Sequence, residues 1–204
     1  MRHDMRTPRL RSWRPLIVAA SITLVASCTT TTTTDAPATD WFDGGPMKAA
    51  SPETLQLTAR VLASKGNTEQ AGFLIDRMAR DYPDNLGTYT EGAEVLLIQG
   101  RVREATEWLE RGLARFPNNP ILRNDRGMCR LLEANLPAAT ADFEAAYAAD
   151  PGDADYVANL ALVRAIAGDT ESARALWSRV LNPEEVEHNI SQAQAAAPKF
   201  KRSG

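Results

Sequence analysis

Cysteine and histidine are the side chains of this sequence with the widest chemistry, and only two of each occur among its 204 residues. A cysteine nucleophile needs a base and an orienting group. No histidine lies close to Cys129 in the sequence, and the only histidine beyond residue 27 is His188. His188 and Glu184 stand one helical turn apart, but two ligands make a weak metal site. We therefore predict a buried, structural Cys129 and a solvent-exposed His188.

These residue types together indicate a protein that is not an enzyme. No glycine-rich phosphate-binding loop occurs in the sequence. Aromatic residues make up only 6% of it, which is too few for a large cofactor pocket. We predict no catalytic residues, no cofactor and no bound metal. The opposing hypothesis, an enzyme, requires turnover that depends on Cys129 or His188.

The other cysteine, Cys28, follows a short apolar segment. Residues 1–15 hold five arginines and one acid, and Leu16–Val25 is a run of ten residues without charge. At about 1.5 Å per helical residue the run spans roughly 15 Å, half of a ~30 Å hydrocarbon core. It is too short for a stable transmembrane helix. A basic segment followed by a short apolar one is typical of a secretory signal.

The residues Val25-Ala26-Ser27-Cys28 resemble the lipobox of bacterial lipoproteins, with valine where leucine is commonest. In that family, the matching cysteine is linked to diacylglycerol and cleavage precedes it. The resemblance implies a signal peptide over residues 1–27 and a bilayer anchor, carrying palmitate-type acyl chains, on Cys28. Thr29 follows in place of aspartate, which implies the outer membrane, facing the periplasm. The alternative is an uncleaved anchor helix with a buried Cys28.

The charge of the chain excludes one class of partner. The formal net charge is −3, but residues 1–27 contribute five arginines against one aspartate. The remaining residues hold 18 basic and 25 acidic side chains, a net of −7. A surface that neutralises phosphates is basic. We therefore expect no nucleic-acid partner.

Residues 28–50 predict a flexible, threonine-rich linker. Thr29–Thr34 is six threonines, and the stretch that follows has no apolar periodicity. A flexible chain of the 22 residues after Cys28 has an r.m.s. span of about 25–28 Å. It lets a folded domain stand off the lipid headgroups. Trp41 and Phe42 interrupt the polar stretch. We expect them to cover one end of the folded domain or, alternatively, to form a docking segment for a partner.

A 34-residue period runs through the chain from Pro52 onward. Four kinds of residue recur at this spacing: alanines (Ala71, Ala105, Ala139, Ala173), prolines (Pro83, Pro117, Pro151), glycines (Gly66, Gly100, Gly168, with Ala134 between) and large apolar residues (Ile75, Leu109, Phe143, Trp177). A small alanine lets two helices approach closely, glycine ends the first helix of a pair, and proline ends the second. A fifth column starts with leucine and then changes to arginine: Leu62, Leu96, Arg130 and Arg164.

This period and these residue types resemble the tetratricopeptide repeat (TPR). The resemblance covers about 132 of the 177 residues that follow residue 27. It implies an all-α fold, a TPR solenoid of four helix-hairpin repeats. Within residues 51–182, we place the units at 52–85, 86–119, 120–153 and 154–182. Each hairpin has two apolar faces, so stacking of neighbouring hairpins completes the core.

A C-terminal capping helix is predicted over residues 183–196. Asn182 is suited to the N-cap and Pro183 to the first helical position. Val186, Ile190 and Ala193 recur on one face, which would cover the last repeat. We expect residues 197–204 to form a loose basic tail.

TPR proteins bind segments of other proteins on the concave face lined by the first helix of each unit. The family's contact positions in that helix are the second, fifth, ninth, twelfth and thirteenth. Carried onto this sequence, they place a partner groove at Arg60, Thr90, Glu94, Leu97, Asn124, Met128, Leu131, Leu162 and Ile166. This surface changes from polar to apolar along the chain, which favours an amphipathic helix or an extended peptide as the bound segment. For Leu131, Leu132 and Ile166, the alternative is packing between repeats.

The C-terminal part carries a narrower resemblance. Residues 159–168, 173–181 and 183–189 look like the end of the TadD-type lipoproteins, which are implicated in assembly of tight-adherence (Flp) pili. The resemblance implies a membrane-anchored interaction scaffold that assists assembly of a pilus or secretion complex. The alternative is a general periplasmic adaptor for another envelope complex.

Overall fold

The structure is a computed structural model that describes residues 50–200. The predicted signal peptide, Cys28, the linker with Trp41 and Phe42, and residues 201–204 lie outside the described residues, apart from Ala50 at the end of the linker. The described residues belong to one compact unit and consist of helices joined by short turns, without a strand. Within residues 50–200, no helix is both long and apolar enough to cross a membrane.

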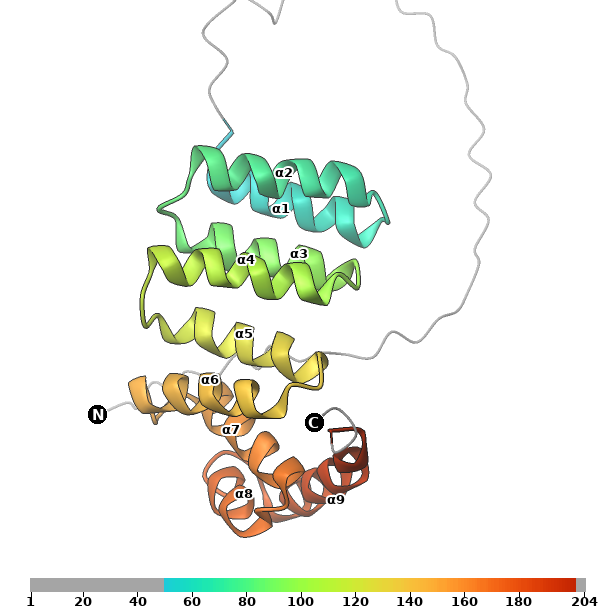
Figure 1. The fold of residues 1–204 in the computed structure, drawn as a ribbon, viewed down its shortest axis with the longest axis vertical. Helices are drawn as coiled ribbons and strands as arrows, with labels where there is room; N and C mark the ends of the chain where they lie inside the picture. Colours follow the sequence, from blue (N-terminus) through green and yellow to red (C-terminus); the bar gives the residue numbers. More distant parts are fainter. Residues whose placement is uncertain (1–49, 201–204) are drawn as a thin grey trace, which may run out of the picture. The chain divides into compact units, whose positions relative to one another are not determined.

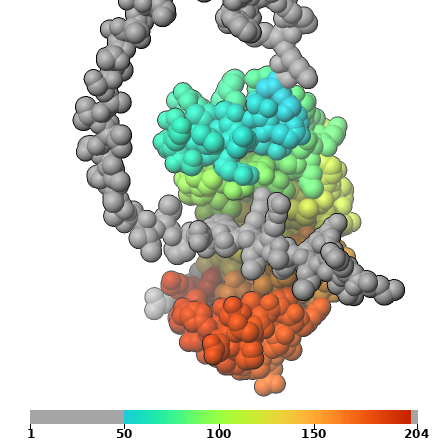
Figure 2. Space-filling model, turned by 180° about the vertical axis from the view of Figure 1, so that it is seen from behind, coloured from blue at the N-terminus to red at the C-terminus, as the bar shows by residue number. Residues whose placement is uncertain are grey.

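Residues 50–200 form nine helices, and the first eight pair as hairpins that follow one another in chain order along the stack (Figure 1; Figure 2). They are α1 (Pro52–Ser64), α2 (Thr68–Asp81), α3 (Leu86–Ile98), α4 (Val102–Arg115), α5 (Pro120–Leu132), α6 (Leu136–Ala149), α7 (Ala154–Ala167), α8 (Thr170–Trp177) and α9 (Pro183–Phe200). Unit 1 is α1 with α2, and units 2, 3 and 4 follow in order. The first helices begin 34 residues apart, so the sequence period is the structural period. The prediction of an all-α TPR solenoid is confirmed.

Local sequence signals fix the ends of the first helices. At the start of α5, Asn119 accepts a hydrogen bond from the backbone N–H of Leu122 (3.1 Å) and Pro120 takes the first helical position. At the end of each first helix the chain turns through a residue with positive φ: 80° at Gly66, 73° at Gly100, 60° at Ala134 and 97° at Gly168. Glycine adopts this conformation without strain, whereas alanine does not.

The columns of small and large residues form the core. The four alanines of the 34-residue period are buried, and so are the four large side chains in step with them: Ile75, Leu109, Phe143 and Trp177. Burial of such a side chain contributes about 1.5–3 kcal/mol. The buried residues fall into two clusters. The first joins units 1 and 2 with α5, and the second runs from the end of α5 to α9.

The C-terminal helix runs further than predicted. α9 extends to Phe200, so residues 197–200 are helical and do not belong to a loose tail. Ala197 and Phe200 pack against the second core cluster, and this packing keeps the last turn helical although Pro198 lacks an N–H. At the other end, Asn182 and Glu185 exchange two hydrogen bonds of 3.0 Å, which form a capping box.

Candidate protein-binding groove

The first helices of the four units, α1, α3, α5 and α7, lie in sequence next to one another and share one surface. We call this surface the groove; it consists of the second, fifth, sixth, ninth, twelfth and thirteenth residues of these helices. Neighbouring helices do not contact each other equally. α1 packs along α3 and α7 packs along α9, whereas α3, α5 and α7 meet over shorter stretches. Within the groove, neighbouring first helices therefore contact each other least in units 2 to 4.

Seven of the nine residues predicted from the sequence are partly exposed on the first helices: Arg60, Thr90, Glu94, Leu97, Asn124, Met128 and Leu162. Leu131 and Ile166 are buried, at 8% and 5% exposed, and belong to the second core cluster. These two side chains support the groove from beneath and do not offer a surface to a partner. Leu132 is 53% exposed, so packing between repeats does not cover it.

The thirteenth residue of each first helix shows how the groove becomes apolar. This column is Ser64, Ile98, Leu132 and Ile166. Ile98 is 45% exposed, whereas Ile166 is buried because α9 packs along α7. Large apolar side chains in this column therefore face solvent where the first helices meet sparsely. With two half-buried side chains from the ninth position, they form what we call the apolar strip: Ile98, Met128, Leu132 and Leu162.

Polar side chains link neighbouring first helices across the groove. Arg60 of α1 donates to Glu91 and, at 3.1 Å, to Glu94, both on α3. Nδ2 of Asn159 on α7 donates to Oδ1 of Asn124 on α5 at 2.8 Å. Two of these links, Arg60–Glu91 and Asn124–Asn159, join the ninth or fifth residue of one helix to the sixth residue of the next, whereas Arg60–Glu94 joins two ninth residues. These links set the spacing between helices on the surface that a partner would contact.

The sixth position was not among the residues predicted from the sequence. Aligning the four units and comparing their sixth residues would have indicated this position. The column begins with Leu57, which is 62% exposed, and continues with the polar residues Glu91, Asp125 and Asn159. The residue is apolar in unit 1, which has no preceding unit, and polar in the three units that have one. This change indicates a position whose polar side chain contacts the preceding unit.

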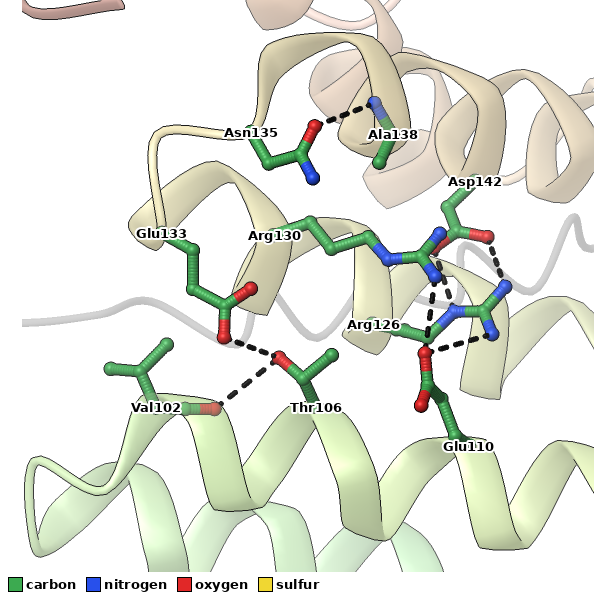
Figure 3. Close-up of polar contacts among 9 residues, drawn as sticks. All are labelled: Val102, Thr106, Glu110, Arg126, Arg130, Glu133, Asn135, Ala138 and Asp142. Atoms are coloured by element: carbon green, nitrogen blue, oxygen red, sulfur yellow. Dashed lines mark hydrogen bonds and ion pairs between the residues drawn. The ribbon is translucent and has the colours of Figure 1, made fainter. Parts of the chain in front are cut away.

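A charged network fixes α5 on its side facing α4 and α6 (Figure 3). Asp142 of α6 accepts two hydrogen bonds from Arg126 (Nη2–Oδ1 2.7 Å, Nε–Oδ2 2.9 Å) and one from Arg130 (2.9 Å). Arg130 also donates to Glu110 of α4 at 3.2 Å. The side chain of Asp142 is 3% exposed, and its hydrogen bonds raise the pKa of Arg126. Because both arginines belong to α5, the network positions the part of the groove that carries Met128.

Cys129 lies in the same helix and is fully buried, as predicted. Burial, with smaller contributions from the charges of Asp125 and Glu133, raises the pKa of the Cys129 thiol to about 12. A protonated thiol is not a nucleophile. Glu133 itself lies 3.1 Å from the hydroxyl of Thr106 and so links unit 3 to α4 (Figure 3).

The described residues offer little else for chemistry. Within residues 50–200, no group of three His, Cys, Asp or Glu side chains could hold a metal ion, and His188 is exposed. A separate open hollow between α2 and α4 is lined by Asp76, Arg101 and Trp108. Arg101 there is bonded to Glu104.

Comparisons with known proteins agree with this fold. No protein-family model matches the sequence, and no curated protein matches it either. The structure is similar to TTC0263, a TPR protein of Thermus thermophilus, with a TM-score of 0.58 and 20% identity, covering 70% of this chain and 81% of that one. It is also similar to Pseudomonas aeruginosa PilF (TM-score 0.58, 17% identity, 73% and 72% covered) and to MamA of Desulfovibrio magneticus (0.53, 21%, 68% and 76%). At these identities, the similarity shows the fold.

Proposed function

We propose that this chain is a membrane-anchored scaffold that holds a segment of another protein in the groove. The observation that carries the proposal is the apolar strip, in which Leu132 and Ile98 stand half-exposed on helices that buried cores hold in place. Exposed apolar side chains gathered on one face mark interaction sites. Apolar anchors at helical spacing suit an amphipathic helix or an extended peptide. The similarity to TPR structures supports a protein-binding scaffold.

The binding role can be tested by placing charge in the apolar strip. Met128→Glu combined with Leu162→Glu should abolish capture of the partner, because desolvating two carboxylates opposes burial of an apolar segment. The matched control is Phe73→Glu on α2, where the wild-type side chain is 63% exposed and outside the groove. Circular dichroism should show unchanged helix content in both variants. Partner capture by the double variant at the wild-type level would contradict the proposal.

The anchor is the part of the proposal that rests on the lipobox-like residues around Cys28. Each buried methylene contributes about 0.8 kcal/mol, so two or three acyl chains hold a protein firmly to a bilayer. Cys28→Ser should remove acyl labelling and deplete the protein from the outer-membrane fraction. Labelling of this variant at the wild-type level would contradict the anchor.

For the biological task, we propose assistance to the assembly of a pilus or secretion complex. The support is the TadD-like C-terminal sequence; the similarity to PilF is compatible with it but concerns the fold. Deletion of the gene should abolish piliation, counted by electron microscopy, and complementation with the Met128→Glu/Leu162→Glu variant should not restore it. Neighbouring genes should encode a secretin and a small pilin. Normal piliation after deletion would favour the second candidate, a general periplasmic adaptor that copurifies with another envelope complex through the same groove.

A further inference from the structure

We infer that the aromatic pair Trp41 and Phe42, in the predicted linker, docks on the N-terminal end of the stack and covers an apolar face that unit 1 leaves open. This inference goes beyond the proposed function, because it concerns the end of the stack and not the segment that the groove holds. It follows from comparing unit 1 with the three units that have another unit before them.

The sixth and tenth residues of a first helix show which side of it faces the preceding unit. In α3 the sixth residue, Glu91, bonds to Arg60 of α1, so this side of α3 faces unit 1. The tenth residue lies one helical turn further along the same side. At this position Val95, Cys129 and Val163 are each 0% exposed. In units 2 to 4, a preceding unit therefore covers this side of the first helix.

In unit 1 the same side of the first helix is exposed. Leu57 and Val61 occupy the sixth and tenth positions of α1 and are 62% and 40% exposed. Val61 and Val95 are the same residue type at equivalent positions, so their difference in exposure reflects the neighbouring unit and not the side chain. Within residues 50–200, no helix hairpin precedes unit 1.

The second helix of unit 1 extends this exposed surface. In unit 2, Glu107 and Trp108 line the hollow between α2 and α4, so this side of α4 faces the preceding unit. Phe73 is the equivalent of Glu107 on α2 and is 63% exposed. Because α1 packs along α2, Leu57, Val61 and Phe73 share the side of unit 1 on which a preceding unit would pack. We call these three residues the open face; exposed apolar side chains gathered in this way mark a contact surface.

The opposite end of the stack shows how this chain covers such a face. There α9 packs along α7, and its buried residues Val186, Ile190 and Ala193 belong to the second core cluster. A segment of the same chain outside the repeats thus closes the C-terminal end. Repeat arrays need a cap at each end, because a terminal unit otherwise exposes the apolar surface that joins neighbouring repeats.

The place where the described chain begins lets the preceding segment reach the open face. The carbonyl of Ala50 accepts a 2.6 Å hydrogen bond from the hydroxyl of Tyr82, and Ala50 packs on the first core cluster. These contacts fix the chain just before α1. Val61 lies about 14 Å along α1 from Pro52. The eight residues that follow Phe42, up to Ala50, span about 26 Å when extended, which is enough to reach every part of the open face.

The composition of this segment singles out the aromatic pair. Trp41 and Phe42 are the only aromatic residues between Cys28 and Ala50. Aromatic side chains bury about 150–250 Å² each. Gly44-Gly45-Pro46 follows them, a sequence typical of turns, which lets the chain reverse direction before α1. A segment joined to the chain beside the face also docks at a higher effective concentration than a second copy of the protein would supply.

Docking of the pair would shorten the tether to the proposed lipid anchor. Only the 12 residues 29–40 would then remain free between Cys28 and the pair. Their r.m.s. span is about 17–21 Å, against about 25–28 Å for the whole linker. The docked pair would therefore hold unit 1 nearer to the bilayer than a free linker does.

The fluorescence of Trp41 tests this docking in the processed protein, reconstituted as one copy in each zwitterionic nanodisc. The chain after residue 27 contains three tryptophans, and two of them, Trp108 and Trp177, are each 2% exposed. Iodide quenches exposed indole rings. It should therefore quench the wild-type protein no more than it quenches Trp41→Phe, which keeps an aromatic ring for docking but only the two buried indoles.

The variant Val61→Glu/Phe73→Glu places two carboxylates on the open face, outside the groove, and should expose Trp41 to iodide because their desolvation opposes docking. Adding Trp41→Phe to this variant should remove the extra quenching. The matched control, Ile98→Glu/Leu132→Glu, changes two half-exposed apolar side chains of the apolar strip and should leave quenching at the wild-type level.

Thermal unfolding gives a second readout. Trp41→Ser/Phe42→Ser should lower the midpoint of the wild-type protein by at least about 3 °C. The same change should lower it by less than about 1 °C when Val61→Glu/Phe73→Glu is already present, because residues in contact do not act additively. In the Ile98→Glu/Leu132→Glu background the full loss should remain.

Three results would overturn the inference. The first is wild-type protein in which iodide quenches Trp41. The second is a shielded Trp41 that Val61→Glu/Phe73→Glu does not expose, because the bilayer or another part of the chain would then cover it. The third is shielding that appears only in nanodiscs loaded with two copies, because a second copy would then be the occupant. Capture by the groove and piliation, which test the proposed function, are decided by none of these results.

Discussion

At the scale of single residues, Gly92 and Trp108 show how each unit fills the same space with different side chains. Trp108 lies against Gly92, and its indole N–H donates to the carbonyl of Thr88 at 3.1 Å. At the two equivalent positions, unit 1 has Thr58 and Leu74, unit 3 has Arg126 and Asp142, and unit 4 has Leu160 and Leu176. The packing of one large side chain over glycine makes Gly92 intolerant of a methyl group.

Gly92→Ala should destabilise the protein by about 1–3 kcal/mol, because a Cβ there would lie 2.2 Å from Nε1 of Trp108, which is itself fixed by a hydrogen bond. Gly72→Ala is the matched control in α2. Its Cβ would meet only a terminal nitrogen of Arg101, at 3.9 Å. Because alanine favours the helix, this variant should gain about 0.5–1 kcal/mol. Urea unfolding followed by circular dichroism measures both, and shifts of the same sign would contradict the packing described.

Ala134 stands where the other three units have glycine, with φ of 60°. An alanine in this left-handed conformation costs about 1–2 kcal/mol. Glycine avoids that cost, but it also raises the conformational entropy of the unfolded chain, which cancels part of the gain in stability. Ala134→Gly should therefore stabilise the protein by about 0.5–1 kcal/mol. Gly168→Ala, at φ of 97°, should destabilise it. A lower urea midpoint for Ala134→Gly would mean that its methyl group makes a contact worth more than the strain.

Cys129 should not react with thiol reagents in the folded protein. Its pKa is raised from 9.0 to about 12, so the protonated thiol is favoured in the folded state. The stability that this group contributes is complete below pH 9 and lost as pH rises toward about 12. In the Cys28→Ser variant, Cys129 is the sole cysteine. Iodoacetamide should modify it only after denaturation in guanidinium chloride, as mass spectrometry would show. Rapid modification of the native protein would require an open path to the thiol.

At the scale of elements, the position of α5 depends on the network around Asp142. Asp142→Asn keeps the shape of the side chain but leaves Arg126 and Arg130 without their main counter-charge. Removing one partner of a buried ion pair costs about 3–5 kcal/mol. On the same helix, Glu144→Gln removes an exposed acid that bonds to Arg164 and should cost about 1 kcal/mol or less. Thermal unfolding compares the two, and equal losses would show that the network does not hold α5.

The same network shows where sequence prediction reaches its limit. The 34-residue columns predict the hairpins, the turns that end the first helices and the buried large residues, because each depends on one side chain and its local backbone. The change from Leu96 to Arg130 in the fifth column interrupts an apolar pattern. In the structure, Arg130 of α5 bonds to Asp142 and Arg164 of α7 bonds to Glu144, so both arginines turn to an acid on α6. Such pairings depend on tertiary geometry, which a repeat pattern does not contain.

The end of α9 and the burial of Ile166 have a related cause. Pro198 signals the end of a helix, yet packing of Phe200 on the second core cluster overrides that signal. The thirteenth position of a first helix signals a groove residue, yet α9 covers it in unit 4. Exposure at Ile98 and Leu132 follows from how far apart the first helices lie, which no single unit specifies.

At the scale of the whole molecule, the described residues form a stack whose groove changes along its length. Unit 1 presents the ion pair of Arg60 with α3, unit 2 adds Glu94 beside Ile98, and units 3 and 4 supply the apolar side chains Met128, Leu132 and Leu162. A single first helix offers too small a surface for a stable contact. Several stacked helices supply it, so the proposed binding would belong to the repeat array and not to any one unit.

Site-specific photo-crosslinking in living cells tests most directly whether the groove holds another protein. The photoreactive residue p-benzoylphenylalanine would replace Leu132 in the groove or, as the control, Phe73 on α2, since both side chains are exposed, at 53% and 63%. With Cys28 unchanged, we expect illumination to join the residue at position 132 to one discrete protein, and the residue at position 73 to none. The same crosslinks at both positions, or none at position 132, would contradict a partner-binding groove.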